Sequence, residues 1–258
     1  MTNSSSGGKA LPPRRFRPTF IATLFVVPLF FGMIALGTWQ LFRLEWKEEQ
    51  IVLRQERAFA PSVDFVESYP GAVADPLAEE FKAVRITGSY RHDREFYLGA
   101  RALDRRIGFL VVTPFELTDG RTILVNRGWV PGDQKDPATR VEAQISGQLT
   151  EEALMRVDGW RGYDFVRPEH DIEENFWFYV DTEVMGTLAG IPNLVQKVYV
   201  DARRQDLPGG YPLGGQTRIE LVNNHLEYVI TWYALAGVLA VIYVLFHYRR
   251  DGDGEDDL

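Results

Sequence analysis

The residues most able to do chemistry lie at the start of the last apolar run of the chain, where His225 precedes Tyr228 and Trp232. A helix turns by about 100° per residue, so Tyr228 would lie about 60° and Trp232 about 20° from His225. One helix face would then carry an imidazole at its end, with an aromatic stripe that continues to Tyr243. A neutral imidazole is a good ligand for iron, and an apolar aromatic wall suits a porphyrin. One interpretation of this pattern is that His225 is a haem-iron ligand.

The same residues also fit a purely structural role. Tyr and Trp gather at the ends of membrane spans whatever the function, and an Asn-Asn-His sequence can simply begin a helix, with Asn223 or Asn224 as the N-cap. Tyr228 and Trp232 would then be interface anchors instead of a pocket wall. The residues alone leave both interpretations open.

A second pair of candidates, Trp39 and Arg43, follows the first apolar run of the chain. The two residues are four apart and therefore share one helix face. Arg43 and Lys47 would stand at the boundary of the membrane. These side chains either contact haem propionates or form an aromatic and cationic interface belt.

The other histidines are weaker candidates. His92 and His170 sit in polar turns and are expected in solvent. His247 comes 22 residues after His225, too far along a helix for the two to hold one iron, and is expected at the membrane interface.

Two long apolar runs must position these residues. The run from Tyr228 to Phe246 has no formal charge and, at about 1.5 Å per residue, reaches about 28 Å as a helix, roughly the hydrocarbon core of a bilayer. The run from Phe20 to Leu36 is uncharged as well. It exceeds the apolar stretch of a signal peptide, and no A-x-A site follows it, so we interpret it as an uncleaved anchor.

Basic residues next to the two runs predict the orientation. Lys and Arg flank the start of the first run and the end of the second, which places both termini in the cytoplasm. The predicted organisation is a disordered cytoplasmic tail (1–17), a transmembrane helix (18–42), an extracytoplasmic β-rich domain (43–227), a second transmembrane helix (228–247) and an acidic cytoplasmic tail (248–258). The first helix is expected to continue beyond the membrane, up to Pro61.

The central segment has the period-two pattern of β-strands. The expected strands are 82–90, 95–103, 108–117, 121–130, 141–149, 175–181 and 195–203. Asp119-Gly120 supplies the positive φ that a tight hairpin needs, and Thr182 could cap a short helix. The predicted fold class is a membrane protein of the α+β type, with two transmembrane helices flanking one antiparallel sheet or small barrel.

Composition excludes several kinds of function. The 258-residue chain carries 36 acidic residues against 28 Lys and Arg, which argues against nucleic acid as a partner. The absence of cysteine excludes disulfides, thiolate-ligated zinc, iron–sulfur clusters and covalent haem attachment. No hydrolase, zinc-protease, Walker or dinucleotide motif is present, so catalysis is the less favoured class.

Four blocks of the sequence resemble the Surfeit-locus assembly-factor family. They are GTWQLFRLEWK, TPFELTDGRTILVNRGWVP, RPEHDIEENFWFYVD and NNHLEYVITWYAL, in this order between the two spans. The resemblance implies a non-enzymatic inner-membrane protein that helps to insert haem a into the large subunit of cytochrome c oxidase. It also implies that the histidine aligned with His225 binds the iron in bacterial members. The implied partners are the oxidase large subunit, haem a synthase and membrane lipid; the alternative is a scaffold without a cofactor.

Two further groups carry predictions. Within the second block, Asn126 to Trp129 are interpreted as scaffold, with Gly128 giving backbone freedom and Trp129 as a core residue or partner anchor. Five arginines around one hairpin form either a solvated face or a basic patch for a carboxylate-rich partner: Arg91, Arg94, Arg101, Arg105 and Arg106.

Overall fold

The structure, a computed structural model, describes residues 14–250. These residues form two compact units: one combines the chain up to Gln50 with the chain from Val222, and the other is Ile51–Leu221. The predicted tails at 1–17 and 248–258 lie largely outside the described residues.

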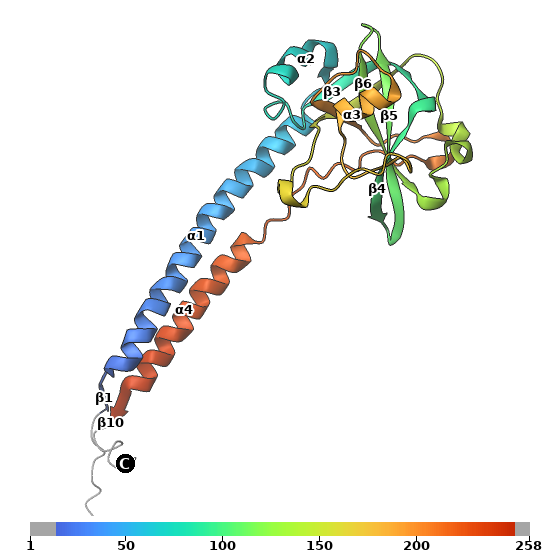
Figure 1. Cartoon of the computed structure of the whole chain (residues 1–258). Coiled ribbons are helices and arrows are strands. Elements are labelled where there is room, and N and C mark those ends of the chain that lie inside the picture. The colour runs from blue at the N-terminus through green and yellow to red at the C-terminus, as the bar shows by residue number, and fades with distance from the viewer. Residues whose placement is uncertain (1–13, 251–258) are drawn as a thin grey trace, which may run out of the picture. The chain divides into compact units, whose positions relative to one another are not determined.

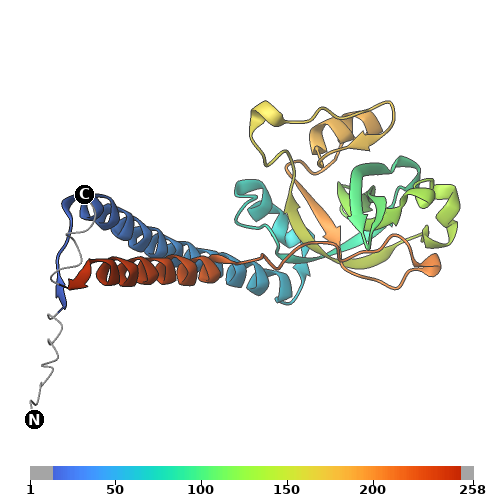
Figure 2. The ribbon, with the colours of Figure 1, turned by 90° about the horizontal axis from the view of Figure 1, so that it is seen from below.

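The first unit consists mainly of two helices that run side by side (Figures 1 and 2). They are α1 (Phe20–Phe59) and α4 (His225–His247), both long and apolar enough to cross a membrane. Most of their large apolar side chains are exposed, as lipid contact requires. α1 continues beyond its apolar part as predicted, and its last turns, from Ile51, belong to the second unit. Two short strands, β1 (Arg14–Phe16) and β10 (Tyr248–Arg250), pair beside the helix ends.

Polar pairs join α1 to α4 along their contact. Thr19 Oγ1 lies 3.0 Å from His247 Nε2, and Thr38 Oγ1 lies 3.0 Å from the Tyr233 hydroxyl. Gly37 allows this approach, since a Cβ there would lie 2.9 Å from the Tyr233 ring. His247, the last residue of α4, is only 1% exposed, because the contact between the helices buries it. Such interhelical bonds are a usual means of joining membrane helices.

The second unit is built on a closed barrel of five strands. Around the barrel each strand pairs with the next, and β3 also pairs with β5 to close the ring; the β6–β9 pair is parallel and the others are antiparallel. In ring order the strands are β3 (Ala83–Tyr90), β7 (Leu149–Val157), β9 (Val198–Ala202), β6 (Thr122–Pro131) and β5 (Arg106–Leu117). The α+β class and the barrel alternative are thereby confirmed.

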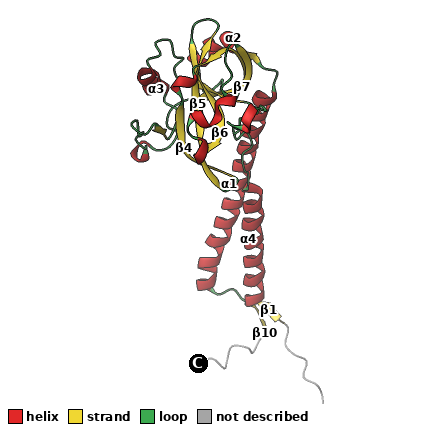
Figure 3. Cartoon of the chain, turned by 90° about the vertical axis from the view of Figure 1, so that its right-hand side faces the viewer, coloured by secondary structure: helices red, strands yellow, loops and turns green. Residues whose placement is uncertain are grey.

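Three further strands and two helices complete the unit (Figure 3). β4 (Phe96–Leu103) pairs with β5 and with the short β8 (Phe176–Trp177), and β2 (Val63–Asp64) pairs with β3. The helices are α2 (Phe65–Ala74) and α3 (Thr182–Ala189). Five 3₁₀ segments lie in the connections: His92–Arg94, Gly132–Gln134, Pro137–Ala143, Asp164–Val166 and Pro208–Gly210.

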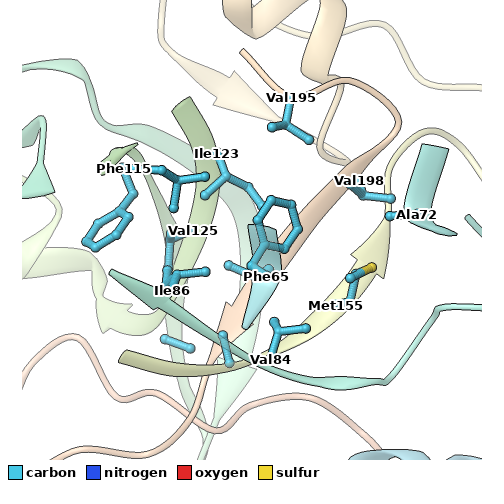
Figure 4. Close-up of a cluster of buried hydrophobic side chains, with 14 of the residues drawn as sticks. Phe65, Ala72, Val84, Ile86, Phe115, Ile123, Val125, Met155, Val195 and Val198 are labelled. Atoms are coloured by element: carbon cyan, nitrogen blue, oxygen red, sulfur yellow. The ribbon is translucent and has the colours of Figure 1, made fainter. Parts of the chain in front are cut away.

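The core fills the barrel and extends over one outer face. Inside, apolar side chains from all five strands surround Phe65 of α2 (Figure 4), and burying such a ring contributes about 1.5–3 kcal/mol. Outside, Leu124 of β6 packs with Trp177 and with Met185 of α3. All ten residues of β6 are therefore buried, because the strand has a packed neighbour on both faces.

Several predicted elements differ from the structure. Segment 141–149, predicted as a strand, instead begins as the end of the 3₁₀ segment Pro137–Ala143 and continues as a loop. Asp136 caps the 3₁₀ segment, and Gly147 in the loop has a φ of +86°. The strand lies instead at β7, whose Glu-Glu-Ala-Leu-Met composition favours a helix; burial inside the barrel overrides that preference. Segment 175–181 contributes only β8, and α2 was not predicted. The cap of α3 is Asp181, not Thr182.

Candidate functional site

His225 opens the first turn of α4 and faces α1. Its Nδ1 lies 2.6 Å from the side-chain oxygen of Gln40. A carboxamide oxygen can only accept, so Nδ1 carries a proton, and in the neutral ring Nε2 is the nitrogen with the free lone pair. Within the described part of the chain, Nε2 has no partner, and the ring is half-buried. The side chain thus presents one free imidazole nitrogen, Nε2, while Gln40 holds the other nitrogen and with it the orientation of the ring.

The start of α4 explains how this ring is held. Asn224 occupies the N-cap position but makes no capping bond with its side chain. Asn223 supplies the bond instead, since its Oδ1 accepts from the His225 backbone N–H at 3.4 Å. The expected role of the two asparagines is therefore divided between them.

The aromatic residues do not form the continuous stripe that helical periodicity predicted. Tyr228 is 54% exposed and Trp232 is half-buried, so both remain open to a ligand near His225. Tyr243 is turned toward α1, where its hydroxyl meets Thr23 at 2.5 Å, and it packs on His247. This part of the prediction is wrong because the imidazole side of α4 is the side that α1 covers.

Trp39 and Arg43 lie on α1 close in sequence to Gln40. Trp39 is 52% exposed, and the Arg43 guanidinium lies 4.3 Å from the centre of the Trp46 ring. Arg43 therefore stacks on Trp46, which the sequence analysis did not single out, and not on Trp39. A cation over an indole face suits a membrane boundary and leaves the guanidinium edge free to donate.

Gln40 is the residue that sequence reasoning missed. It is the one carboxamide between Phe20 and Phe42, and a buried amide in an apolar span is costly unless it is hydrogen-bonded. That isolated polar side chain was the available signal. Its partner could not be read from the sequence, because His225 is 185 residues away.

Both histidines that were expected in solvent are largely covered. His92 bonds the Ile145 carbonyl at 3.1 Å and Arg127 at 3.3 Å, and burial lowers its pKa. His170 lies between the rings of Trp177 and Tyr179, and burial lowers its pKa as well. The described residues contain no cluster of three or more His and acidic side chains that could hold a metal ion.

The central block behaves as scaffold. The pairing of β5 with β6 shifts register at Arg127, which leaves one extra residue in β6, a bulge. Gly128 has a φ of +120°, and a Cβ there would lie 1.9 Å from the Leu213 carbonyl oxygen, so only glycine fits. Asn126 donates to Asp201 at 2.8 Å, and Trp129 is buried.

The five arginines around the predicted hairpin differ in their partners. Three are paired with nearby carboxylates: Arg91 with Asp93 and Glu116, Arg94 with Asp93, and Arg106 with Asp133.

Comparison with known proteins identifies the family. A family model described as "SURF1 family" matches residues 26–237. The chain belongs to the SURF1 family. A SURF1-like protein of Monosiga brevicollis is 34% identical over 99% of this chain and 97% of its own length. Surfeit locus protein 1 of Homo sapiens is 35% identical over 85% of this chain and 75% of its own, and that of Takifugu rubripes is 34% identical over 81% and 89%. The matched range contains both Gln40 and His225.

Proposed function

We propose that this chain is a cytochrome c oxidase assembly factor that holds haem a at His225 and passes it to the large subunit of the oxidase. The SURF1 family is known as a family of cytochrome oxidase assembly factors, which supports the first part of the proposal. The second part, haem carriage, rests on the site.

The observation that carries haem binding is the fixed tautomer of His225. Gln40 accepts from Nδ1, which orients the ring and leaves Nε2 as the nitrogen that can ligate iron. Haem a, when bound, would supply the iron that this nitrogen ligates. Trp232 and the exposed Tyr228 would line the porphyrin, while Trp39 and Arg43 would approach its propionates. One imidazole in an open site suits a carrier, since a modest affinity allows release.

The proposal includes a place in the cell. The two apolar helices would span the inner membrane, with both termini in the cytoplasm and the barrel in the periplasm. Membrane lipid, the oxidase large subunit and haem a synthase would be its neighbours. A lipophilic haem could then keep its tail in the bilayer while the iron is held at the membrane edge.

The test is an absorption spectrum of the full chain purified after co-expression with haem a synthesis. His225→Gln should lose at least nine-tenths of the co-purifying haem. His247→Gln is the matched control, because the same substitution falls on the same helix at a histidine whose two ring nitrogens are already bonded to Thr19 and Tyr243. If the His225→Gln protein and the parent chain co-purify with equal amounts of haem, the proposal of haem carriage at this residue is contradicted.

One observation favours a second candidate, a scaffold without a cofactor. The bond from His225 to Gln40 is also one of a series of polar pairs between α1 and α4, and such a bond can serve to join the helices alone. A scaffold should cross-link to oxidase assembly intermediates equally well with and without haem a synthesis. A cross-link that requires haem a would contradict this alternative.

A further inference from the structure

A cavity of about 730 Å³ lies wholly within the second unit. That volume is within the range of about 300–1,000 Å³ that is usual for small-molecule sites. Its walls come from the last turns of α1, from the five strands β4, β5, β6, β7 and β9, and from the segment that follows β9. The iron ligation proposed at His225 does not account for it.

The charge of this cavity is unbalanced. Five arginines line it: Arg54, Arg101, Arg156, Arg161 and Arg218. Two of them are neutralised, since Arg156 donates to Asp201 at 2.8 Å and both Arg156 and Arg161 contact Glu80.

The other three arginines have no acidic partner. Among residues 14–250, no carboxylate lies within ion-pairing distance of Arg54, Arg101 or Arg218. Three guanidinium groups that share one cavity repel each other and attract an anion. Their planar donors fit carboxylate or phosphate oxygens in pairs.

The same cavity has an apolar wall. Phe81 lies between two guanidinium groups, with the central carbons of Arg54 and Arg156 each 4.8 Å from its ring centre. Trp129 adds an indole whose Nε1 donates to the Arg101 carbonyl at 2.8 Å. Leucines 103, 110 and 221 complete this surface. A ligand here would need an apolar body as well as a negative charge.

The walls are held in place before any ligand arrives. Asp201, 4% exposed, accepts from Asn126 at 2.8 Å, from Arg156 at 2.8 Å and from Thr217 at 2.7 Å. Phe81 has a φ of +66°, a conformation that is rare for a bulky residue. Backbone strain of this kind is concentrated at ligand sites. A preformed wall lowers the ordering cost of binding.

We propose that this cavity binds an amphiphilic anion, an apolar body that carries two or more negative oxygen groups. Two sources share this chemistry: a porphyrin with its two carboxylates, and an anionic lipid with its phosphate. The three unpaired arginines would bind the charged groups, and Phe81 and Trp129 would contact the apolar body. This site is separate from the iron ligation proposed at His225.

The test uses the full chain in a neutral detergent and two probes. The first is iron-free mesoporphyrin, which cannot be ligated by His225, with its dimethyl ester as the uncharged comparison. The second is short-chain phosphatidylglycerol. We expect one saturable site, with the ester bound at least tenfold more weakly than the diacid and with affinity falling as salt rises. The probe that binds more tightly identifies the source of the anion.

Two triple variants separate a local effect from a change in net charge. The cavity variant combines Arg54→Gln, Arg101→Gln and Arg218→Gln and should bind the charged probes at least tenfold more weakly than the parent chain. The control variant makes the same change at three arginines outside the cavity, Arg85, Arg94 and Arg167, and should stay within about twofold of the parent chain. Should the cavity variant fail to fold, Arg218→Gln alone is used, because this side chain is exposed and has no partner among the described residues; it should weaken binding about threefold.

Two outcomes would overturn the proposal. One is equal affinity of the parent chain, the cavity variant and the control variant for the charged probes. The other is the absence of saturable binding by either probe. Since neither probe contains iron, both outcomes would leave the proposed haem carriage at His225 standing.

Discussion

Replacing Gln40 by Leu tests how the site at His225 is built. Leucine has a similar size and suits an apolar span, but it removes the oxygen that lies 2.6 Å from Nδ1. The imidazole then loses the acceptor that fixes its tautomer and its orientation, while the nitrogen proposed as the iron ligand is untouched.

The expected effect follows from that single bond. Removing the hydrogen-bond partner of a metal-ligating histidine typically lowers metal affinity by about 10–100-fold, which corresponds to about 1.4–2.7 kcal/mol of binding free energy. Gln40→Glu should have the opposite effect, because a carboxylate is a stronger acceptor and makes Nε2 more basic.

The assay is a titration of the purified full chain with ferric haem, followed in the Soret band. Thr38→Val is the control, since it removes the bond to Tyr233 in the same helix contact without touching His225. It should leave the haem affinity unchanged. The reasoning is refuted if Gln40→Leu keeps the parent affinity while His225→Gln loses it, because the ring would then need no support from α1.

Three further predictions concern the barrel unit and are measured by unfolding the full chain in detergent. Gly128→Ala should lower the free energy of unfolding by about 3 kcal/mol or more, because the new Cβ would overlap the Leu213 carbonyl. A decrease below about 1 kcal/mol would contradict this close approach. Arg140→Met should lower the free energy of unfolding by about 3–5 kcal/mol, because it leaves the buried Glu95 without its main partner. Adding Glu95→Gln should restore most of this free energy. If it restores none, the loss comes from packing and not from the unpaired charge. Burial raises the pKa of Glu151 above its ordinary value of 4.5, so the stability that its protonated form contributes is lost as the pH rises through that raised pKa. Glu151→Gln should therefore raise the unfolding temperature by a few degrees at pH 8 and not near pH 4, whereas an equal gain at both would contradict the shift.

The elements that could be predicted are those whose signal is local. Both membrane helices follow from apolar length alone, and the hairpin between β5 and β6 follows from Asp119-Gly120, where Gly120 has a φ of +85°. β7 could not be predicted, because its residues favour a helix and only the surrounding barrel makes them a strand. Closure of the barrel through β3 and β5 likewise depends on contacts between distant segments.

The site shows the same division between local and long-range information. Helical periodicity places His225, Trp232 and Tyr243 on one side of α4, but it cannot indicate which side the neighbouring helix covers. That choice removes Tyr243 from the predicted wall and brings Gln40 to the imidazole. Whether His225 binds haem stays a prediction.

The closed ring of strands also limits how this protein can meet a partner. The eight-stranded sheet ends at β2 and β8, each only two residues long, so neither end strand offers a long edge to another polypeptide. Exposed strand edges are the usual route to intermolecular pairing, and a protein that works beside incompletely assembled subunits would be at risk of trapping them. For the assembly role proposed above, we therefore expect recognition through side chains, which can be released again, and not by adding a strand to β2 or β8.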